Sequence, residues 1–248
     1  MTGEISKTQV DRLGDRLRKG NISDDDLRLL DMYRRSFSEA YEIVVRAIRQ
    51  ELSLEPTGRP AKSTTSISDK LRRESIRLTQ IQDIAGCRLI VADIANQELV
   101  VQSLKNLFED VTVIDRREQP SHGYRAVHVV VRSRGKSIEI QVRTQLQHLW
   151  AELSEKLSDV IDPAIKYGGG GETVREILVD TSSTVASEES AETQLVNLTQ
   201  QGDFTDDDEQ IIGLRERLAA VRKDLFKNLR ETIAVVEELK GEDDALSD

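Results

Sequence analysis

The sequence predicts an α/β protein with a mixed β-sheet flanked by helices. Short segments that are wholly apolar, or that alternate apolar and polar residues, predict strands, and they gather between residues 86 and 144. Segments with apolar residues three and four positions apart predict helices, and they precede, interrupt and follow these strands. Strands and helices mixed along one stretch of chain are typical of the α/β class.

The expected elements follow in chain order. A helix over 23–53 starts with a capping box at Ser23 and Asp26, and Pro56 and Gly58 end it. The remaining elements are a basic helix over about 66–78, a strand over 86–93, a helix to residue 108, a strand over 111–116, strands over 124–132 and 136–144 joined by a Ser-Arg-Gly turn, and a helix over 145–160.

Composition divides the chain into four parts: an N-terminal helical segment (1–54), the α/β domain (55–167), a flexible acidic linker (168–210) and an amphipathic helix (211–240). The linker is expected because 180–209 is rich in Ser, Thr, Asp, Glu and Gln and poor in large apolar residues. The last helix either packs back on the domain or pairs with a partner helix, which leaves a homo-oligomer open.

The sequence also indicates a location. It has no apolar run of about 18 residues, so no membrane span is expected. Its first residues lack the basic and apolar blocks of a signal peptide. A single cysteine, Cys87, excludes an internal disulfide framework and suits a reducing compartment. A cytoplasmic protein is expected.

The charge is unevenly distributed. The chain as a whole has a net charge of -10, but residues 58–150 hold fifteen Lys and Arg against ten Asp and Glu, a net of +5. The flanking parts therefore hold a net of -15. A basic centre within an acidic protein indicates an anionic ligand bound by that centre, although the same charges could simply solvate surface helices.

One strand carries the polar side chains that first indicate a site. The run 138–144 sends three aliphatic residues to one face and Glu139, Gln141 and Arg143 to the other. A carboxylate and a guanidinium this close together suit a metal-bound phosphate ligand. A solvated strand face would show the same alternation, so the strand alone leaves both readings open.

Other residues of the basic centre extend this pattern. Tyr124 and His128 share a face of the preceding strand and can align with Glu139 across the hairpin, while Asp83 precedes the strand over 86–93. Asp83 and Glu139 are candidate Mg²⁺ ligands, and Tyr124 could stack on a base. The cations available to neutralise phosphate are Arg59, Lys62, Arg72, Arg73, Arg88 and Arg143. The residues thus indicate phosphoryl transfer, with structural roles as the alternative.

Four short motifs resemble the synthetase domain of RelA/SpoT-type alarmone synthetases, especially the small single-domain members. They are KSTTSI from Lys62, DIAGCR from Asp83, GYRAVH from Gly123 and EIQVRT from Glu139, and the next helix carries Trp150 and Ala151. The likeness covers roughly residues 55–167. It implies a nucleotidyltransferase-like synthetase domain with helical N- and C-terminal extensions.

The resemblance also implies a reaction. Such a GTP pyrophosphokinase moves pyrophosphate from ATP to the 3′-hydroxyl of GDP or GTP, making guanosine tetra- or pentaphosphate and AMP. By that likeness Asp83 and Glu139 would hold Mg²⁺, and Glu139 would help to activate the hydroxyl. The implied ATP-binding residues are Arg59, Lys62 and Arg88, and the implied acceptor-binding residues are Tyr124, Arg125, His128, Gln141 and Arg143.

Two departures from the family pattern keep alternatives open. Two residues separate Arg59 from Lys62 where the family usually has one, and the loop at Pro120, Ser121 and His122 is shorter and lacks a lysine. A toxin-like relative acting on adenine nucleotides or on the 3′ end of tRNA, or an inactive nucleotide-binding module, is therefore an alternative. Hydrolysis of the alarmone is not expected, because no His-Asp pairs precede residue 58.

Overall fold

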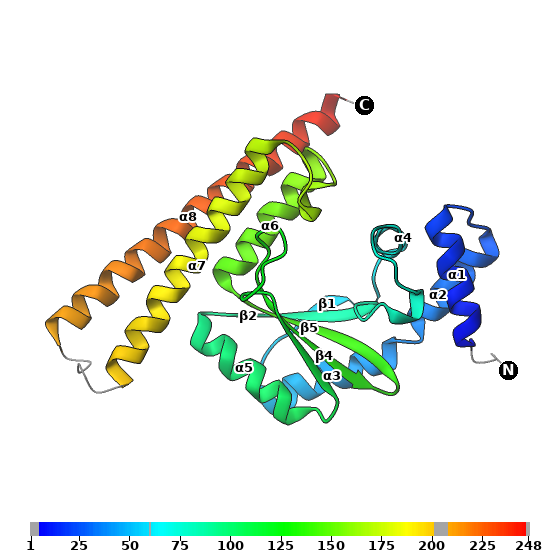
Figure 1. Cartoon of the computed structure of the whole chain (residues 1–248), viewed down its shortest axis with the longest axis horizontal. Helices are drawn as coiled ribbons and strands as arrows, with labels where there is room; N and C mark the ends of the chain where they lie inside the picture. Colours follow the sequence, from blue (N-terminus) through cyan, green and yellow to red (C-terminus); the bar gives the residue numbers. More distant parts are fainter. Residues whose placement is uncertain (1–4, 60, 201–207, 247–248) are drawn as a thin grey trace. The chain divides into compact units, whose positions relative to one another are not determined.

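The computed structural model describes residues 5–59, 61–200 and 208–246, apart from the side chains of Arg59 and 241–246 (Figure 1). The chain forms two compact units, each built from several segments. The first unit comprises the residues up to Leu89, 101–114 and 128–142, and the second comprises 90–100, 115–127 and the residues from Arg143 onward. Each unit is described by itself.

A five-stranded sheet with the strand order β1-β2-β5-β4-β3 confirms the predicted mixed sheet. Its strands are β1 (Thr57–Arg59), β2 (Ala85–Val91), β3 (Val111–Asp115), β4 (Val127–Ser133) and β5 (Lys136–Thr144). β1 runs antiparallel to β2, with Arg59 opposite Gly86. In β5 the alternation predicted from the sequence is present, because Ile138, Ile140 and Val142 are fully buried.

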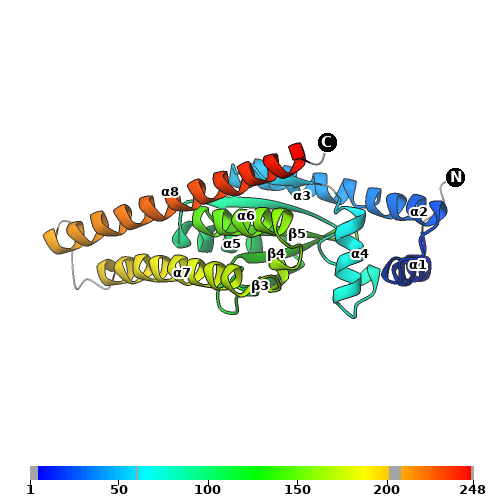
Figure 2. The same ribbon diagram turned by 90° about the horizontal axis from the view of Figure 1, so that it is seen from above.

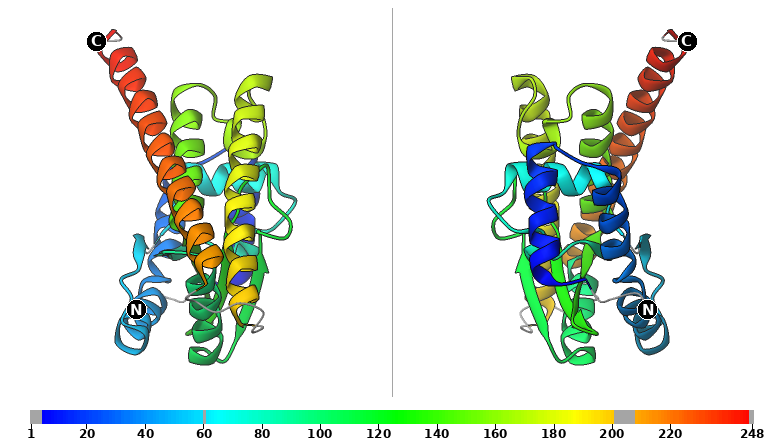
Figure 3. Two further views of the ribbon diagram at one scale, coloured as in Figure 1. Left: turned by 90° about the vertical axis from the view of Figure 1, so that its left-hand side faces the viewer. Right: turned by 90° about the vertical axis from the view of Figure 1, so that its right-hand side faces the viewer.

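Most of the sheet lies in the first unit together with four helices and a short 3-10 turn. These are α1 (Lys7–Lys19), α2 (Asp24–Arg35), α3 (Ser38–Leu52), α4 (Thr64–Arg73) and η1 (Leu78–Gln80). Helix α1 packs against α2, α4 and η1 (Figure 3). Its inward residues Leu13 and Leu17 are fully buried, and its capping box at Ser6 and Gln9 fixes its start.

The single helix predicted over 23–53 is wrong, because the chain breaks into α2 and α3 at Ser36 and Phe37. The Ser36 hydroxyl donates to the Tyr33 carbonyl oxygen at 2.6 Å, which competes with helix continuation. Phe37 is buried edge-on against Tyr33, with the ring centroids 5.2 Å apart. The basic helix predicted over 66–78 also differs, since α4 ends at Arg73 and Leu78 begins η1.

The second unit is dominated by three helices, α6 (Gln145–Val160), α7 (Glu172–Gln200) and α8 (Glu209–Leu246), which pack against one another (Figures 2 and 3). A short 3-10 turn, η2 (Ile165–Tyr167), follows α6. The shared apolar core includes Leu149, Trp150, Leu153, Leu178, Val185, Leu229, Ile233 and Val236. The predicted C-terminal helix is present as α8.

The flexible linker predicted over 168–210 is wrong for 172–200, which form the 29-residue helix α7. The buried residues of this helix are Leu178, Ser182, Val185, Glu188, Glu189 and Leu195. Three of these six are polar, so a pattern of apolar residues alone did not reveal the buried face. Residues 201–207, also assigned to the linker, lie outside the described part of the chain.

Several elements contain residues of both units. Helix α5 (Ile94–Leu107) begins in the second unit and ends in the first, and β2, β3, β4 and β5 each have residues in both. The units are therefore not consecutive stretches of chain. No helix in the described residues combines the length and apolar character needed to cross a membrane.

Candidate active site

In the first unit, Asp83 lies between two lysines. The Lys62 ammonium donates to Asp83 Oδ2 at 2.5 Å, and the Lys70 ammonium donates to Oδ1 at 2.9 Å. All three side chains are about four-fifths buried. Burial would raise the pKa of Asp83, but the two ammonium charges outweigh it and hold that pKa below its ordinary value. Asp83 is therefore a carboxylate at neutral pH.

The start of α4 explains how the two lysines reach this carboxylate. Ser63 caps the helix, and its hydroxyl oxygen accepts a hydrogen bond from the Ser66 amide at 3.2 Å. The fully buried Ile67 anchors the first turn. Lys62 therefore stands just before the helix, where its amide donates to the Ile84 carbonyl oxygen at 2.6 Å, and Lys70 reaches Asp83 from two turns further along.

Glu139, on β5, is held by two side chains of the same unit. His128 Nδ1 lies 2.8 Å from Glu139 Oε1, and the Gln141 amide donates to Oε2 at 2.8 Å. Burial would raise the pKa of Glu139, but the hydrogen bonds from His128 and Gln141 and the charge of His128 outweigh it, so the pKa is lowered. An ionised carboxylate only accepts hydrogen bonds, so the His128 Nδ1 carries the proton.

Gly86 brings β2 and β5 close together beside Glu139. A Cβ on Gly86 would lie 2.6 Å from the Glu139 carbonyl oxygen and 3.4 Å from its Cβ, so only glycine fits here. Gly86 and Arg88 alternate on β2 with the buried Cys87, so Arg88 projects to the same side of the sheet as Glu139. The charge of Asp83 acts to raise the pKa of Glu139, which places the two carboxylates within electrostatic range.

The chemistry of this pair fits magnesium. Asp83 and Glu139 are both ionised, and Mg²⁺ usually takes one or two carboxylates and completes its coordination with water and substrate phosphate. The described residues contain no cluster of three or more His, Cys, Asp or Glu able to hold a metal ion.

In the second unit, Tyr124 lies in a tight turn rather than on a strand. The prediction that it shares a strand face with His128 is wrong, because β4 begins only at Val127. Ser121 and Tyr124 exchange backbone hydrogen bonds of 2.9 and 3.2 Å across His122 and Gly123, which both have positive φ. A Cβ on Gly123 would lie 2.7 Å from the Trp150 ring, so the turn needs glycine there.

Tyr124 contacts two further residues of this unit. The Arg143 guanidinium donates to its hydroxyl oxygen at 3.0 Å and lies 5.1 Å from the ring centroid. The Trp150 ring lies 6.4 Å away, tilted by 50°. Trp150 is itself fixed, since its indole nitrogen donates to the Leu178 carbonyl oxygen at 2.7 Å. Tyr124 and Arg143, predicted together from the sequence, are thus in direct contact.

Arg125 lies next to a buried carboxylate that the sequence did not predict. It donates to the Arg117 carbonyl oxygen at 3.0 Å, and another guanidinium nitrogen lies 3.7 Å from Glu189 Oε2. Glu189 Oε1 accepts hydrogen bonds from the Thr144 hydroxyl at 2.8 Å and the Gln147 amide at 2.9 Å. Burial raises the pKa of Glu189 above its ordinary value despite these partners.

Three further cations predicted from the sequence are Arg59, Arg72 and Arg73. Arg72 pairs with Asp69 at 3.4 Å on α4, and Arg73 pairs at 2.9 Å with Glu74, the residue after this helix; the four side chains are 38–52% exposed. Arg59 lies on β1, but its side chain is outside the described part of the structure.

Sequence reasoning assigned no specific role to Lys70 and missed Glu189 entirely. Lys70 could have been suspected from its place in the basic helix. Glu189 left no signal in the motifs.

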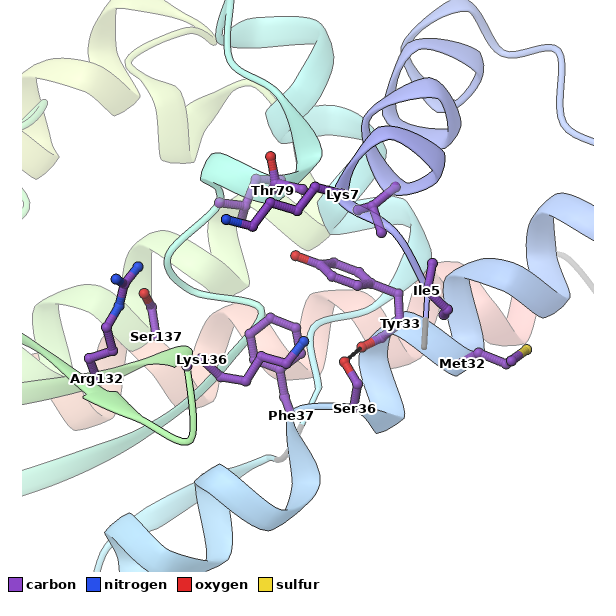
Figure 4. Close-up of a pocket in the computed structure, with 13 residues that line it drawn as sticks. Ile5, Lys7, Met32, Tyr33, Ser36, Phe37, Thr79, Arg132, Lys136 and Ser137 are labelled. Carbon is purple, nitrogen blue, oxygen red and sulfur yellow. Dashed lines mark hydrogen bonds between the residues drawn. The ribbon is translucent and has the colours of Figure 1, made fainter. Parts of the chain in front are cut away.

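A pocket of about 520 Å³ in the first unit is lined by none of the predicted site residues (Figure 4). Lys136 lines it, with its ammonium 4.9 Å from the Phe37 ring centroid and 5.5 Å from that of Tyr33. Burial raises the pKa of Tyr33 to about 12. Lys136 thus ties the β4–β5 hairpin to the junction of α2 and α3.

Comparison with solved structures defines the class of protein. The crystal structure of the small alarmone synthetase 1 from Bacillus subtilis superposes with a TM-score of 0.52 at 27% sequence identity, over 72% of this chain and 100% of that one. The fold is therefore that of an alarmone synthetase.

Sequence comparison matches part of the chain to a known family. Residues 58–158, which contain the four motifs, match the region found in RelA / SpoT proteins. The uncharacterized protein Rv1366 of Mycobacterium tuberculosis is 41% identical over 112 residues, which are 43% of this chain and 41% of that protein. The probable GTP diphosphokinase RSH2, chloroplastic, of Arabidopsis thaliana is 34% identical over 95 residues, 37% of this chain and 13% of that protein. The chain thus spans well under half the length of these relatives.

Proposed function

We propose that this chain is a pyrophosphokinase that transfers the β,γ-pyrophosphoryl group of ATP to the 3′-hydroxyl of GDP or GTP. The single observation that carries the proposal is the carboxylate and lysine arrangement of the first unit. There Asp83 and Glu139 are both ionised, Asp83 is bracketed by Lys62 and Lys70, and Glu139 is oriented by His128 and Gln141. These are the charges that phosphoryl transfer requires.

The proposed step balances as an in-line displacement. The 3′-hydroxyl oxygen of the acceptor forms a bond to the β-phosphorus of ATP, the bond from that phosphorus to the α,β-bridging oxygen breaks, and AMP leaves. Glu139 takes the hydroxyl proton, and the hydrogen bond from His128 Nδ1 keeps the carboxylate in one orientation for that task. Lys62 and Lys70 stabilise the charge that builds up on the phosphate oxygens.

Asp83 and Glu139 would hold Mg²⁺. When bound, the cation would supply charge neutralisation and orientation of the triphosphate. Arg88 projects to the same side of the sheet as Glu139 and is assigned to the ATP phosphates, together with Arg59.

The acceptor is assigned to residues of the second unit. Tyr124 offers a ring for stacking of the guanine base, while Arg125 and Arg143 are assigned to the acceptor's ribose and phosphates. The residues before Gly123 and Tyr124, which are Pro120, Ser121 and His122, lack the lysine usual in the family. Adenine nucleotides and the 3′ end of tRNA therefore remain acceptors to be tested.

The test uses ATP labelled in its γ-phosphate, Mg²⁺ and the full chain, with GDP, GTP, AMP or deacylated tRNA added in turn. Label on GDP or GTP with release of AMP supports the proposal. Label on tRNA or AMP alone would show that the protein transfers pyrophosphate to an acceptor other than GDP or GTP. Transfer of label to none of these acceptors would refute the proposal.

A matched pair of variants tests the carboxylate. Glu139→Gln keeps the size and removes the charge, so we expect turnover to fall by at least about a hundredfold, as for loss of a general base. Glu109→Gln makes the same change at an exposed position of the same unit and should leave the rate unchanged. Equal rates for the two variants would remove Glu139 from the mechanism.

A further inference from the structure

Helix α7 contacts the turn that carries Tyr124 and Arg125. The Ser182 hydroxyl donates to the Gly123 carbonyl oxygen at 2.6 Å. One turn earlier, the Leu178 carbonyl oxygen accepts from the indole nitrogen of Trp150, whose ring lies against Gly123. Helix α7 lies outside residues 58–158, the part of the chain that matches the region found in RelA / SpoT proteins.

Two turns beyond Ser182, Glu189 links this segment to the end of β5. One of its oxygens accepts from Thr144 and Gln147, at the start of α6, and the other faces the Arg125 guanidinium at 3.7 Å. Glu189 is 3% exposed, so these contacts are shielded from water. One carboxylate therefore joins the GYR motif, the EIQVRT motif and the first turn of α6.

The neighbouring Glu188 is an internal comparison. It is also buried, at 5% exposure, but it faces α8, where the Arg222 guanidinium donates to its Oε1 at 2.7 Å. Both carboxylates thus lie on α7 and are similarly buried. Of the two, only Glu189 contacts a residue assigned to acceptor binding.

We propose that Glu189 is a positioning residue for acceptor binding, fixing the Arg125 guanidinium so that α7 forms part of the acceptor site. This inference rests on the proposed pyrophosphokinase function. Loss of the Glu189 charge would leave Arg125 its hydrogen bond to the Arg117 carbonyl oxygen, which binds one guanidinium nitrogen. Acceptor affinity would then fall, while ATP affinity would not change.

Glutamine substitutions separate this role from simple helix packing. Glutamine retains an oxygen that can accept the hydrogen bonds now made to Glu188 Oε1 and Glu189 Oε1, and each substitution removes one ion pair with an arginine. Glu189→Gln and Glu188→Gln should therefore change the melting temperature to a similar extent. Any kinetic difference between them then reports on Arg125 and not on folding.

The experiment measures KM for the acceptor, KM for ATP and kcat for the wild-type chain and both variants. We expect Glu189→Gln to raise acceptor KM by roughly five- to tenfold, the range for loss of one charge interaction, with ATP KM unchanged. Glu188→Gln should match the wild type. An unchanged acceptor KM in Glu189→Gln, or an equal change in both variants, would overturn the proposal.

A binding readout without ATP completes the test. Trp150 is the only tryptophan, and its ring lies beside Tyr124, so its fluorescence should respond to GDP binding. The GDP concentration at half-saturation should rise in Glu189→Gln by the same factor as KM. A wild-type chain that transfers label to no acceptor would refute the proposed function, whereas an active wild type with an unaltered Glu189→Gln would refute only the positioning role.

Discussion

Replacing Asp83 by asparagine should strongly destabilise the first unit. The change removes the one carboxylate between Lys62 and Lys70 and leaves two mostly buried ammonium groups facing each other. Breaking a fully buried ion pair costs about 3–5 kcal/mol. Because these side chains retain about one-fifth of their exposure, solvent screening reduces the expected loss to roughly 2–3 kcal/mol.

Helix α4, which carries Lys70, offers a matched control. Asp69→Asn removes a carboxylate from this helix, but its partner Arg72 is 52% exposed and lies 3.4 Å away. Surface pairs of this kind contribute about 0–1 kcal/mol. Thermal unfolding followed by far-ultraviolet circular dichroism should therefore show a drop of roughly 4–12 °C for Asp83→Asn and little change for Asp69→Asn.

A third variant tests the cause. In Asp83→Asn/Lys70→Met one of the two unneutralised ammonium groups is gone, so part of the lost melting temperature should return. If Asp83→Asn and Asp69→Asn lowered the melting temperature equally, or if Lys70→Met made Asp83→Asn worse, the ion cluster would not be the source of the stability.

Two further expectations follow from the packing and the titrations. Gly86→Ala should lower both the melting temperature and the transfer rate, because its Cβ would lie 2.6 Å from the Glu139 carbonyl oxygen. Gly213, in α8, has open space around it, so Gly213→Ala should stabilise the folded protein by up to about 1 kcal/mol. Equal effects of the two alanines would contradict the close approach of β2 and β5. Because the pKa values of Asp83 and Glu139 are lowered in the folded protein, the stability that these carboxylates contribute is lost as the pH falls through those values. Because the pKa of Glu188 is raised, the stability that it contributes declines as the pH rises above 4.5. In Asp83→Asn the melting temperature should therefore fall less steeply than in the wild type as the pH is lowered. In Glu188→Gln it should fall less steeply as the pH is raised above 4.5. Melting temperatures that depend on pH as in the wild type would contradict these pKa shifts.

The features that the sequence predicted correctly are those set by local periodicity. The alternation in 138–144 placed Ile138, Ile140 and Val142 in the core and Glu139 on the polar side, because side-chain direction in a strand is fixed by the backbone. The contact between Glu139 and His128 followed from the hairpin. The Ser23 capping box also marks the true start of α2, since a cap depends only on nearby residues.

The features that the sequence did not reveal depend on contacts between distant residues. Glu189 lies 45 positions from Thr144, and its helix turns a partly polar face inward, so neither spacing nor apolar periodicity indicated burial. Tyr124 lies in a turn and not in the predicted strand, because His122 and Gly123 adopt positive φ. Alternation of apolar and polar residues does not indicate such backbone angles.

The interleaving of the two units limits how this protein can be divided. One helix and four strands pass from one unit to the other, so neither unit corresponds to a contiguous gene fragment. A truncation after Tyr167 would remove α7 and α8 and expose Leu149, Trp150 and Leu153 of α6 to solvent. The C-terminal helices are therefore not a detachable module that could be exchanged between relatives without rebuilding the core beneath them.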